Sequence, residues 1–177
     1  MTEKSFLAGF GGQGIISMGQ IWVYLAMQEG KNVTFFPFYG AEKRGGIARA
    51  GVVVSDEEIA SPLVTVPDSV MVMNSDSLPL CEGILKSGGL MLINTSLVKE
   101  SPKRTDIKII PVEATGLAEK IGQVKFANMV ALGALAKATG ALKLTDTEAI
   151  LKKFFPPDKH RFVPENVKAI QTGFEAI

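Results

Sequence analysis

The chain has 177 residues, of which 46% are hydrophobic and 21% charged, a composition that favours one globular domain and excludes a wholly disordered chain. Its 19 basic and 18 acidic side chains nearly cancel, which argues against a nucleic-acid-binding protein. The one cysteine, Cys81, excludes an intramolecular disulfide, a four-thiolate zinc site and an iron–sulfur cluster within this chain.

Strand and helix signals alternate along most of the chain. Short apolar runs predict strands, and apolar residues that recur every three or four positions predict helices. In the first half we expect a strand at 5–9, a helix at 15–29 closed by Gly30, strands at 32–38 and 47–55, a returning strand at 59–66, a strand at 69–74, and a helix at 75–85 capped by Ser75 or Asp76. In the second half we expect strands at 90–94 and 107–112 and helices at 115–122, 126–139, from Thr145 or Asp146 to Phe155, and 164–177.

This alternation predicts the fold class. Strands that alternate with helices form a largely parallel sheet covered by helices on both faces, which is the α/β class. We expect one α/β domain over residues 1–155. Residues 156–177 are expected to form a C-terminal helical arm of the same domain, because Pro156 and Pro157 interrupt the chain before the last helix.

A Gly-rich turn joins the first predicted strand to the first predicted helix. Gly9, Gly11 and Gly14 have the spacing G-x-G-x-x-G, which lets the backbone approach an anion closely at a helix start. A dinucleotide site also needs a carboxylate at the end of the second strand, and Phe38-Tyr39 stands there. Two interpretations remain: an anion or coenzyme A contact, or close packing against the sheet or another subunit. Both concern the same residues, Gly9, Gly11, Gly12, Gln13 and Gly14.

A second loop, residues 39–46, follows the second predicted strand. It carries two adjacent cations, Lys43 and Arg44, followed by Gly45 and Gly46, and this combination could hold a phosphate or a carboxylate. A solvated turn with an internal Glu42–Arg44 pair is the alternative. We expect the loop beside the Gly-rich turn, since ligands of open α/β sheets bind at the carboxyl ends of the strands.

Together these segments resemble a known family. The segments 9–14, 39–46, 68–74 and 125–133 are similar, in order and spacing, to the gamma subunit of the 2-oxoacid:ferredoxin oxidoreductases. The resemblance runs from about Lys4 to Gly140, and Asn74 and Asn128 fall at positions that look like family positions. The sequence of the second loop from Lys43 onward is closer to the 2-oxoglutarate branch, and to its branched-chain neighbour, than to the pyruvate branch.

The resemblance implies a Rossmann-like three-layer α/β/α sandwich inside a multi-subunit enzyme. Such enzymes decarboxylate a 2-oxoacid on thiamine diphosphate, pass electrons through iron–sulfur clusters to ferredoxin, and release an acyl-CoA. The resemblance places thiamine diphosphate, Mg²⁺ and the clusters in partner subunits: alpha, beta and, as a further candidate, a ferredoxin-like delta subunit. Coenzyme A is then a co-substrate. This chain is expected to be structural, to bind no cofactor by itself and to be inactive alone.

Other chemistry-bearing residues favour no catalytic role. His160, the only histidine, lies in a charged turn, and Cys81 follows an apolar segment typical of the core. No cluster of side chains predicts a metal site. The apolar runs are too short to span a bilayer and the first residues lack a signal-peptide pattern, so we expect a cytoplasmic protein that binds no membrane. The alternative to the subunit is a stand-alone nucleotide- or coenzyme A-binding Rossmann-like module.

Overall fold

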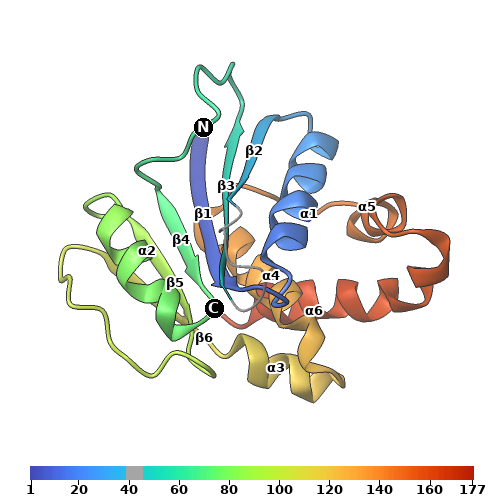
Figure 1. Ribbon diagram of the computed structural model, residues 1–177. Helices are drawn as coiled ribbons and strands as arrows, with labels where there is room; N and C mark the ends of the chain where they lie inside the picture. Colours follow the sequence, from blue (N-terminus) through green and yellow to red (C-terminus); the bar gives the residue numbers. More distant parts are fainter. Residues whose placement is uncertain (39–45) are drawn as a thin grey trace.

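The computed structural model describes residues 1–38 and 46–177, and over these residues one six-stranded sheet forms the centre of the molecule (Figure 1). The strands are β1 (Thr2–Phe10), β2 (Asn32–Phe38), β3 (Ile47–Ser55), β4 (Ser69–Val72), β5 (Leu90–Asn94) and β6 (Lys108–Val112). The α-helices are α1 (Ile15–Gln28), α2 (Leu78–Ile84), α3 (Ala114–Ile121), α4 (Ala127–Thr139), α5 (Thr147–Phe154) and α6 (Val163–Glu175). Three short 3-10 helices complete the elements: η1 (Ser75–Ser77), η2 (Val124–Phe126) and η3 (Pro157–Phe162).

The sheet has the strand order β2-β3-β1-β4-β5-β6. β1, β4, β5 and β6 pair in parallel, whereas β3 runs antiparallel to both of its neighbours, β1 and β2. β3 is the exception because the loop between β2 and β3 is short, and a parallel pair would need a crossover of a dozen or more residues. All the other strands point the same way, so the predicted largely parallel sheet is confirmed.

Two hydrophobic cores lie on the two faces of the sheet. Because side chains alternate along a strand, Leu7 of β1 packs into the core under α1, α4 and α6, while its neighbour Phe6 faces the core under α2. Figure 1 shows α2 on one side of the sheet and the other helices grouped on the opposite side. The predicted three-layer α/β/α sandwich is therefore confirmed, with unequal outer layers.

One predicted strand is wrong. Residues 59–66 form no strand and lie in the irregular connection from β3 to β4. Pro62 interrupts the segment, and only Val64 within it is buried, where it packs against the backbone of Gly51. The segment therefore packs on the second core through Val64 and the partly buried Ile59, and it lacks the alternating burial of a paired strand.

The helix boundaries agree with the sequence to within a few residues, but the predicted caps are only partly right. The helix predicted from residue 75 begins as η1 and continues as α2, and Asn74 stands at the cap position expected for Ser75 or Asp76. Asp146 is at the N-cap of α5, as expected, although its side chain makes no capping bond. Gly30 has the left-handed backbone, with φ 75°, that a closing glycine requires.

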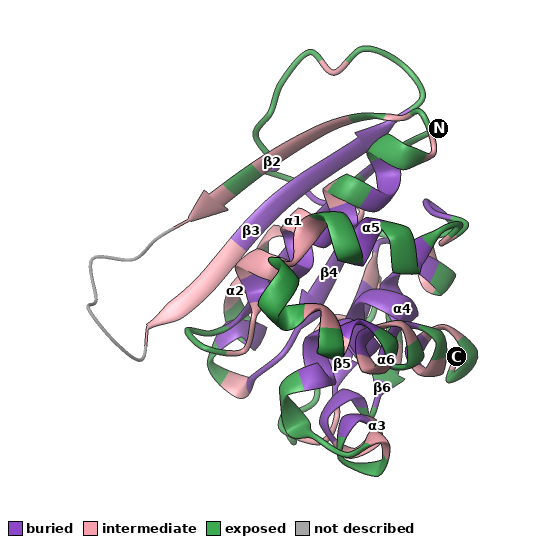
Figure 2. Cartoon of the chain, turned by 90° about the vertical axis from the view of Figure 1, so that its right-hand side faces the viewer, coloured by how far each residue is buried: buried purple, intermediate pink, exposed green. Residues whose placement is uncertain are grey.

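The C-terminal helix packs into the main core. Ala169 and Ile170 of α6 are buried with residues of α4, and α4 itself is enclosed along most of its length (Figure 2). The two helices approach so closely that the backbone of Gly133 lies against Ile170 and that of Gly173 against Val130. Residues 163–175 thus share the core of the preceding residues.

At the amino end of the sheet, the carboxyl group of Glu3 is buried between β1 and β4. It accepts hydrogen bonds from Ser69 Oγ at 2.6 Å and from Ser5 Oγ at 3.2 Å. Burial raises the pKa of Glu3 above its ordinary value of 4.5, and Asp68 raises it further, while the two hydroxyl donors and Lys86 oppose the shift.

This carboxyl group predicts a pH-dependent stability. Because its pKa is raised in the folded state, the folded protein holds a proton that the unfolded chain has lost, and stability falls as pH rises from the ordinary to the raised pKa. Glu3→Gln is expected to raise the free energy of unfolding by about 1 kcal/mol near neutral pH. The difference should vanish below about pH 4, where both side chains are neutral. Urea unfolding of the wild type and of Glu3→Gln between about pH 4 and pH 7 measures this difference. The same free energy of unfolding for both proteins at every pH would contradict the prediction.

Candidate functional site

The Gly-rich turn lies at the carboxyl edge of the sheet, between the end of β1 and the start of α1. Gln13 closes it from inside: its backbone N–H donates to Phe10 O at 3.1 Å, and its side-chain Oε1 accepts from Phe10 N at 2.6 Å. Gln13 Nε2 donates to Met73 O at 3.2 Å, just beyond β4. Gln13 therefore fastens the turn to the neighbouring strand, and its amide faces the protein.

The glycines of the turn divide into two pairs. A Cβ at Gly9 would lie 2.6 Å from Gln13 Oε1 and 2.8 Å from Met73 Cβ, and one at Gly14 would overlap the side chain of Asn128. Gly14 also has a left-handed backbone, with φ 74°. These two glycines serve close packing.

The other pair, Gly11 and Gly12, meets little of the part of the chain that the structure describes. A Cβ at Gly11 would only touch Gly46 O, at 3.6 Å, and one at Gly12 would meet no described atom within 4 Å. Gly12 needs its φ of 102° for the turn itself. Among the described residues, the backbone at these two positions is therefore the least enclosed part of the turn.

A small cavity of about 130 Å³ opens beside the turn. It is bounded by Gly12, Gln13, Met73, Leu97, Thr115, Val124, Lys125 and Ala127. The exposed apolar side chains of Phe10, Leu97 and Val124 surround this end of the sheet. Among the described residues, this edge thus combines Gly backbone, the Lys125 side chain and exposed apolar side chains. Thr115 and Lys125 were not predicted as site residues, because only the fold brings α3 and η2 to the Gly-rich turn.

Two buried asparagines follow the central strands at the same edge. Asn94, at the end of β5, bonds with both the hydroxyl and the backbone N–H of Thr115. Asn74, after β4, accepts from Ser77 Oγ, while its Nδ2 is buried without a partner among the described residues. These amides fix the loops after β4 and β5, in keeping with the family resemblance of Asn74.

The second predicted loop is described only at its end. Lys43, Arg44 and Gly45 lie outside the described residues, whereas Gly46 accepts a hydrogen bond from Gly11 N at 3.0 Å. The next residue, Ile47, pairs with Phe10 across β3 and β1. Gly46 therefore joins the Gly-rich turn directly.

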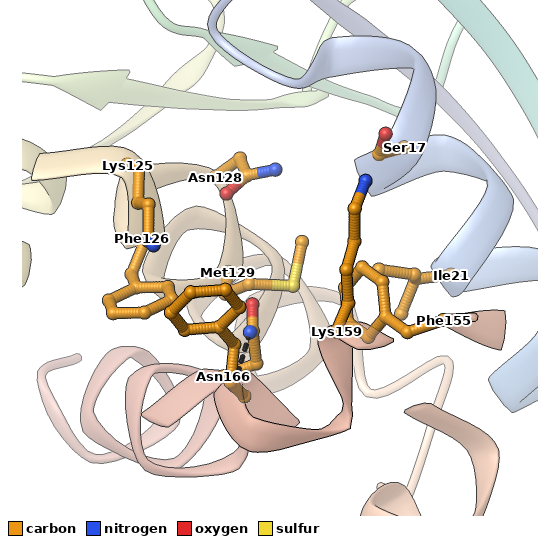
Figure 3. Close-up of a pocket in the computed structure, with 10 residues that line it drawn as sticks. Ser17, Ile21, Lys125, Phe126, Asn128, Met129, Phe155, Lys159 and Asn166 are labelled. Carbon is orange, nitrogen blue, oxygen red and sulfur yellow. Dashed lines mark hydrogen bonds between the residues drawn. The ribbon is translucent and has the colours of Figure 1, made fainter. Parts of the chain in front are cut away.

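A larger cavity of about 280 Å³ lies between the helices behind the turn (Figure 3). It is formed by the first turns of α1, by η2 and α4, and by η3 with the start of α6. Its wall shares Lys125 with the smaller cavity, and Asn128, which donates to Gly14 O at 3.2 Å, separates it from the Gly-rich turn. The sequence did not predict this cavity.

The two remaining candidate side chains are held in structural roles. A ring nitrogen of His160, Nε2, bonds with Phe155 O at 2.9 Å. Burial raises the pKa of the Cys81 thiol to about 12, so the thiolate that a nucleophile requires is not formed at neutral pH. Neither residue lies at the carboxyl edge, and no catalytic role follows for them.

Two searches of the described residues bear on metals and membranes. No group of three or more His, Cys, Asp or Glu side chains there could hold a metal ion. No helix in residues 1–38 or 46–177 is both long and apolar enough to cross a bilayer.

The fold and the edge together define a Rossmann-like α/β protein with a Gly-rich turn at the carboxyl ends of its strands. The sequence matches the family "Pyruvate ferredoxin/flavodoxin oxidoreductase" over residues 4–176. The chain therefore belongs to this family.

Individual relatives are consistent with this assignment. The chain is 36% identical to the 2-oxoglutarate synthase subunit KorC of Methanothermobacter marburgensis, over 100% of this chain and 97% of KorC. It is 35% identical to the ketoisovalerate oxidoreductase subunit VorA of the same organism, of which it spans 35% of the length. The keto/oxoacid ferredoxin oxidoreductase gamma subunit from Geobacter sulfurreducens has the same fold, with a TM-score of 0.83, 28% identity and coverage of 98% and 96% of the two chains. The chain is thus a gamma-type subunit of the 2-oxoacid:ferredoxin oxidoreductases, and the resemblance is confirmed.

Proposed function

We propose that the chain is the gamma subunit of a thiamine diphosphate-dependent 2-oxoglutarate:ferredoxin oxidoreductase. That enzyme would oxidatively decarboxylate its 2-oxoacid to an acyl-CoA and pass the electron pair to ferredoxin. The observation that carries the proposal is the match to the KorC subunit along 97% of its length. Gamma subunits named for pyruvate and ketoisovalerate match at similar identity, and the loop sequence favours the 2-oxoglutarate branch and its branched-chain neighbour over the pyruvate branch.

The residue types in this chain are consistent with a structural role in such an enzyme. Iron–sulfur clusters need several thiolates, and the chain has only the buried Cys81. Decarboxylation of a 2-oxoacid needs a cofactor that stabilises a carbanion. We therefore assign thiamine diphosphate, Mg²⁺ and the clusters to alpha and beta partners, with a ferredoxin-like delta subunit as a further candidate.

The carboxyl edge is the surface that we assign to the shared site. Phe10, Leu97 and Val124 give it exposed apolar area, which is typical of a surface that contacts another subunit. The backbone N–H of Gly12, beside the small cavity, gives it a donor for an anion such as a phosphate of coenzyme A. Lys43, Arg44 and Gly45 would add to it from the adjoining loop. The turn would thus lie where gamma subunit, partner and coenzyme A meet.

The test is Gly11→Ala in the assembled enzyme. Among the described residues the added methyl group would meet only Gly46 O, at 3.6 Å, so the free energy of unfolding should change by less than about 0.5 kcal/mol. It should nevertheless lower acyl-CoA formation by about tenfold or more, because it projects from the backbone that ligand or partner approaches. Gly83→Ala, also in open space but far from the edge on α2, is the matched control and should leave activity unchanged.

The copurified complex distinguishes the parts of this proposal. Assays with 2-oxoglutarate, pyruvate and 3-methyl-2-oxobutanoate identify the branch, and preference for either of the last two would overturn the 2-oxoglutarate assignment. Unchanged activity and unchanged subunit content in Gly11→Ala would remove the turn from the shared site. If the full chain is recovered without partners, calorimetric titration with coenzyme A, NAD and FAD tests the alternative of a stand-alone binding module, which the open backbone at Gly12 favours.

A further inference from the structure

The cavity of about 280 Å³ behind the Gly-rich turn has an apolar part and a polar part. The apolar part is formed by Ile21, Phe126, Met129, Phe155 and Phe162. Three aromatic rings among these five side chains provide flat walls, against which another ring packs favourably. The size lies near the lower limit for ligand pockets, so it suits a single ring with a short chain and is too small for a nucleotide.

Lys125 belongs to the wall of the cavity. Its Nζ lies 3.7 Å from the centre of the Phe162 ring and 5.2 Å from that of Phe126. A cation over aromatic faces at these distances is held by the rings. Its ammonium therefore fixes two of the aromatic walls.

The polar part lies where η3 faces the first turns of α1. Figure 3 shows the ammonium of Lys159 pointing toward Ser17, and both residues line this end of the cavity. The buried carboxamide of Asn128 lies on the adjacent side. None of the residues that line the cavity is acidic, and within the described part of the chain Lys159 makes no ion pair.

We propose that this cavity binds a small organic acid with one carboxylate and an aromatic body. The carboxylate lies between Lys159 and the Ser17 hydroxyl, and the ring lies among the phenylalanines. Two ammonium groups belong to the wall of the cavity, and the aromatic rings engage that of Lys125. The ammonium of Lys159 is then the one that can pair with a ligand, and it matches a single negative charge and not a phosphate dianion. This site is additional to the coenzyme A and subunit surface proposed for the Gly-rich turn, and it does not depend on that proposal.

Calorimetric titration of the full chain with 3-phenylpropionate tests the site, with uncharged 3-phenylpropionamide as the matched probe. We expect the acid to bind about tenfold more tightly than the amide, because a hydrogen bond to a charged group outweighs one to a neutral group by about this factor. The affinity for the acid should fall as salt is raised, since Lys159 is exposed to solvent.

Two lysine variants make the test specific. Lys159→Gln should weaken 3-phenylpropionate binding by about tenfold and leave binding of the amide unchanged. Lys168→Gln removes an exposed lysine of α6 that does not line the cavity, so it should bind like the wild type. Equal affinity for acid and amide, no heat with the acid at millimolar concentration, or equal effects of the two variants would each overturn the proposal.

Discussion

Replacing Gly133 or Gly173 with alanine is expected to lower the free energy of unfolding by about 3 kcal/mol. A Cβ at Gly133 would overlap the carbonyl oxygen of Ile170 and lie 2.9 Å from the backbone nitrogen of Phe174. A Cβ at Gly173 would overlap the carbonyl oxygen of Val130 and lie 3.0 Å from its Cα. The obstacles are backbone atoms of a facing helix, so a rotamer change cannot relieve them, and α4 and α6 would have to separate.

Unfolding in urea followed by Trp22 fluorescence measures this effect. Trp22 is fully buried, so its emission should shift to longer wavelength as the core opens. Gly83→Ala is the matched control, because it is also a helical glycine but has open space around it; there alanine should stabilise by up to about 1 kcal/mol. Gly133→Ala or Gly173→Ala with the stability of Gly83→Ala would mean that the two helices do not approach as described.

The sequence predicted most of the fold because each signal was local. The apolar run at 90–94 gave the bounds of β5 without error, and the apolar stretch before Gly140 predicted α4 to within one residue. The direction of β3 and the close approach at Gly133 were not predicted. The sequence around Gly133 does not show which element its α-carbon contacts. That element is α6, which lies some forty residues further along the chain, so the contact is known only once the fold has placed the two helices together.

The Gly-rich turn was predicted in place, whereas its contact with a ligand or a partner stays a prediction. The spacing of Gly9, Gly11 and Gly14 located the turn. Spacing alone, however, cannot distinguish a glycine that is required by close packing, such as Gly9 or Gly14, from one where a side chain would fit, such as Gly11. The sequence did not predict that the Gln13 side chain bonds inward to Phe10 and Met73. Lys159 belonged to a charged turn in the sequence and lines a cavity only because η3 folds back over α1.

The second large effect concerns Gly14. Gly14→Ala is expected to lower the free energy of unfolding by about 2 to 3 kcal/mol, since alanine is strained at φ 74° and its methyl group would overlap Asn128. Asn128→Ala alone should cost about 1 kcal/mol, because it removes the hydrogen bond from Nδ2 to Gly14 O. The same unfolding measurements apply to both variants.

The double variant separates strain from overlap. Removing the Asn128 carboxamide makes space for the methyl group at Gly14, so the double variant should be about 1 kcal/mol more stable than the sum of the single losses predicts. Strict additivity would mean that only the left-handed backbone requires a glycine at this position. The favourable coupling that we expect would show that Gly14 and Asn128 form one packed contact between α1 and α4. In that case packing against α4 holds the turn in place, and Gly11 and Gly12 remain as the part that we propose for contact with a ligand or a partner.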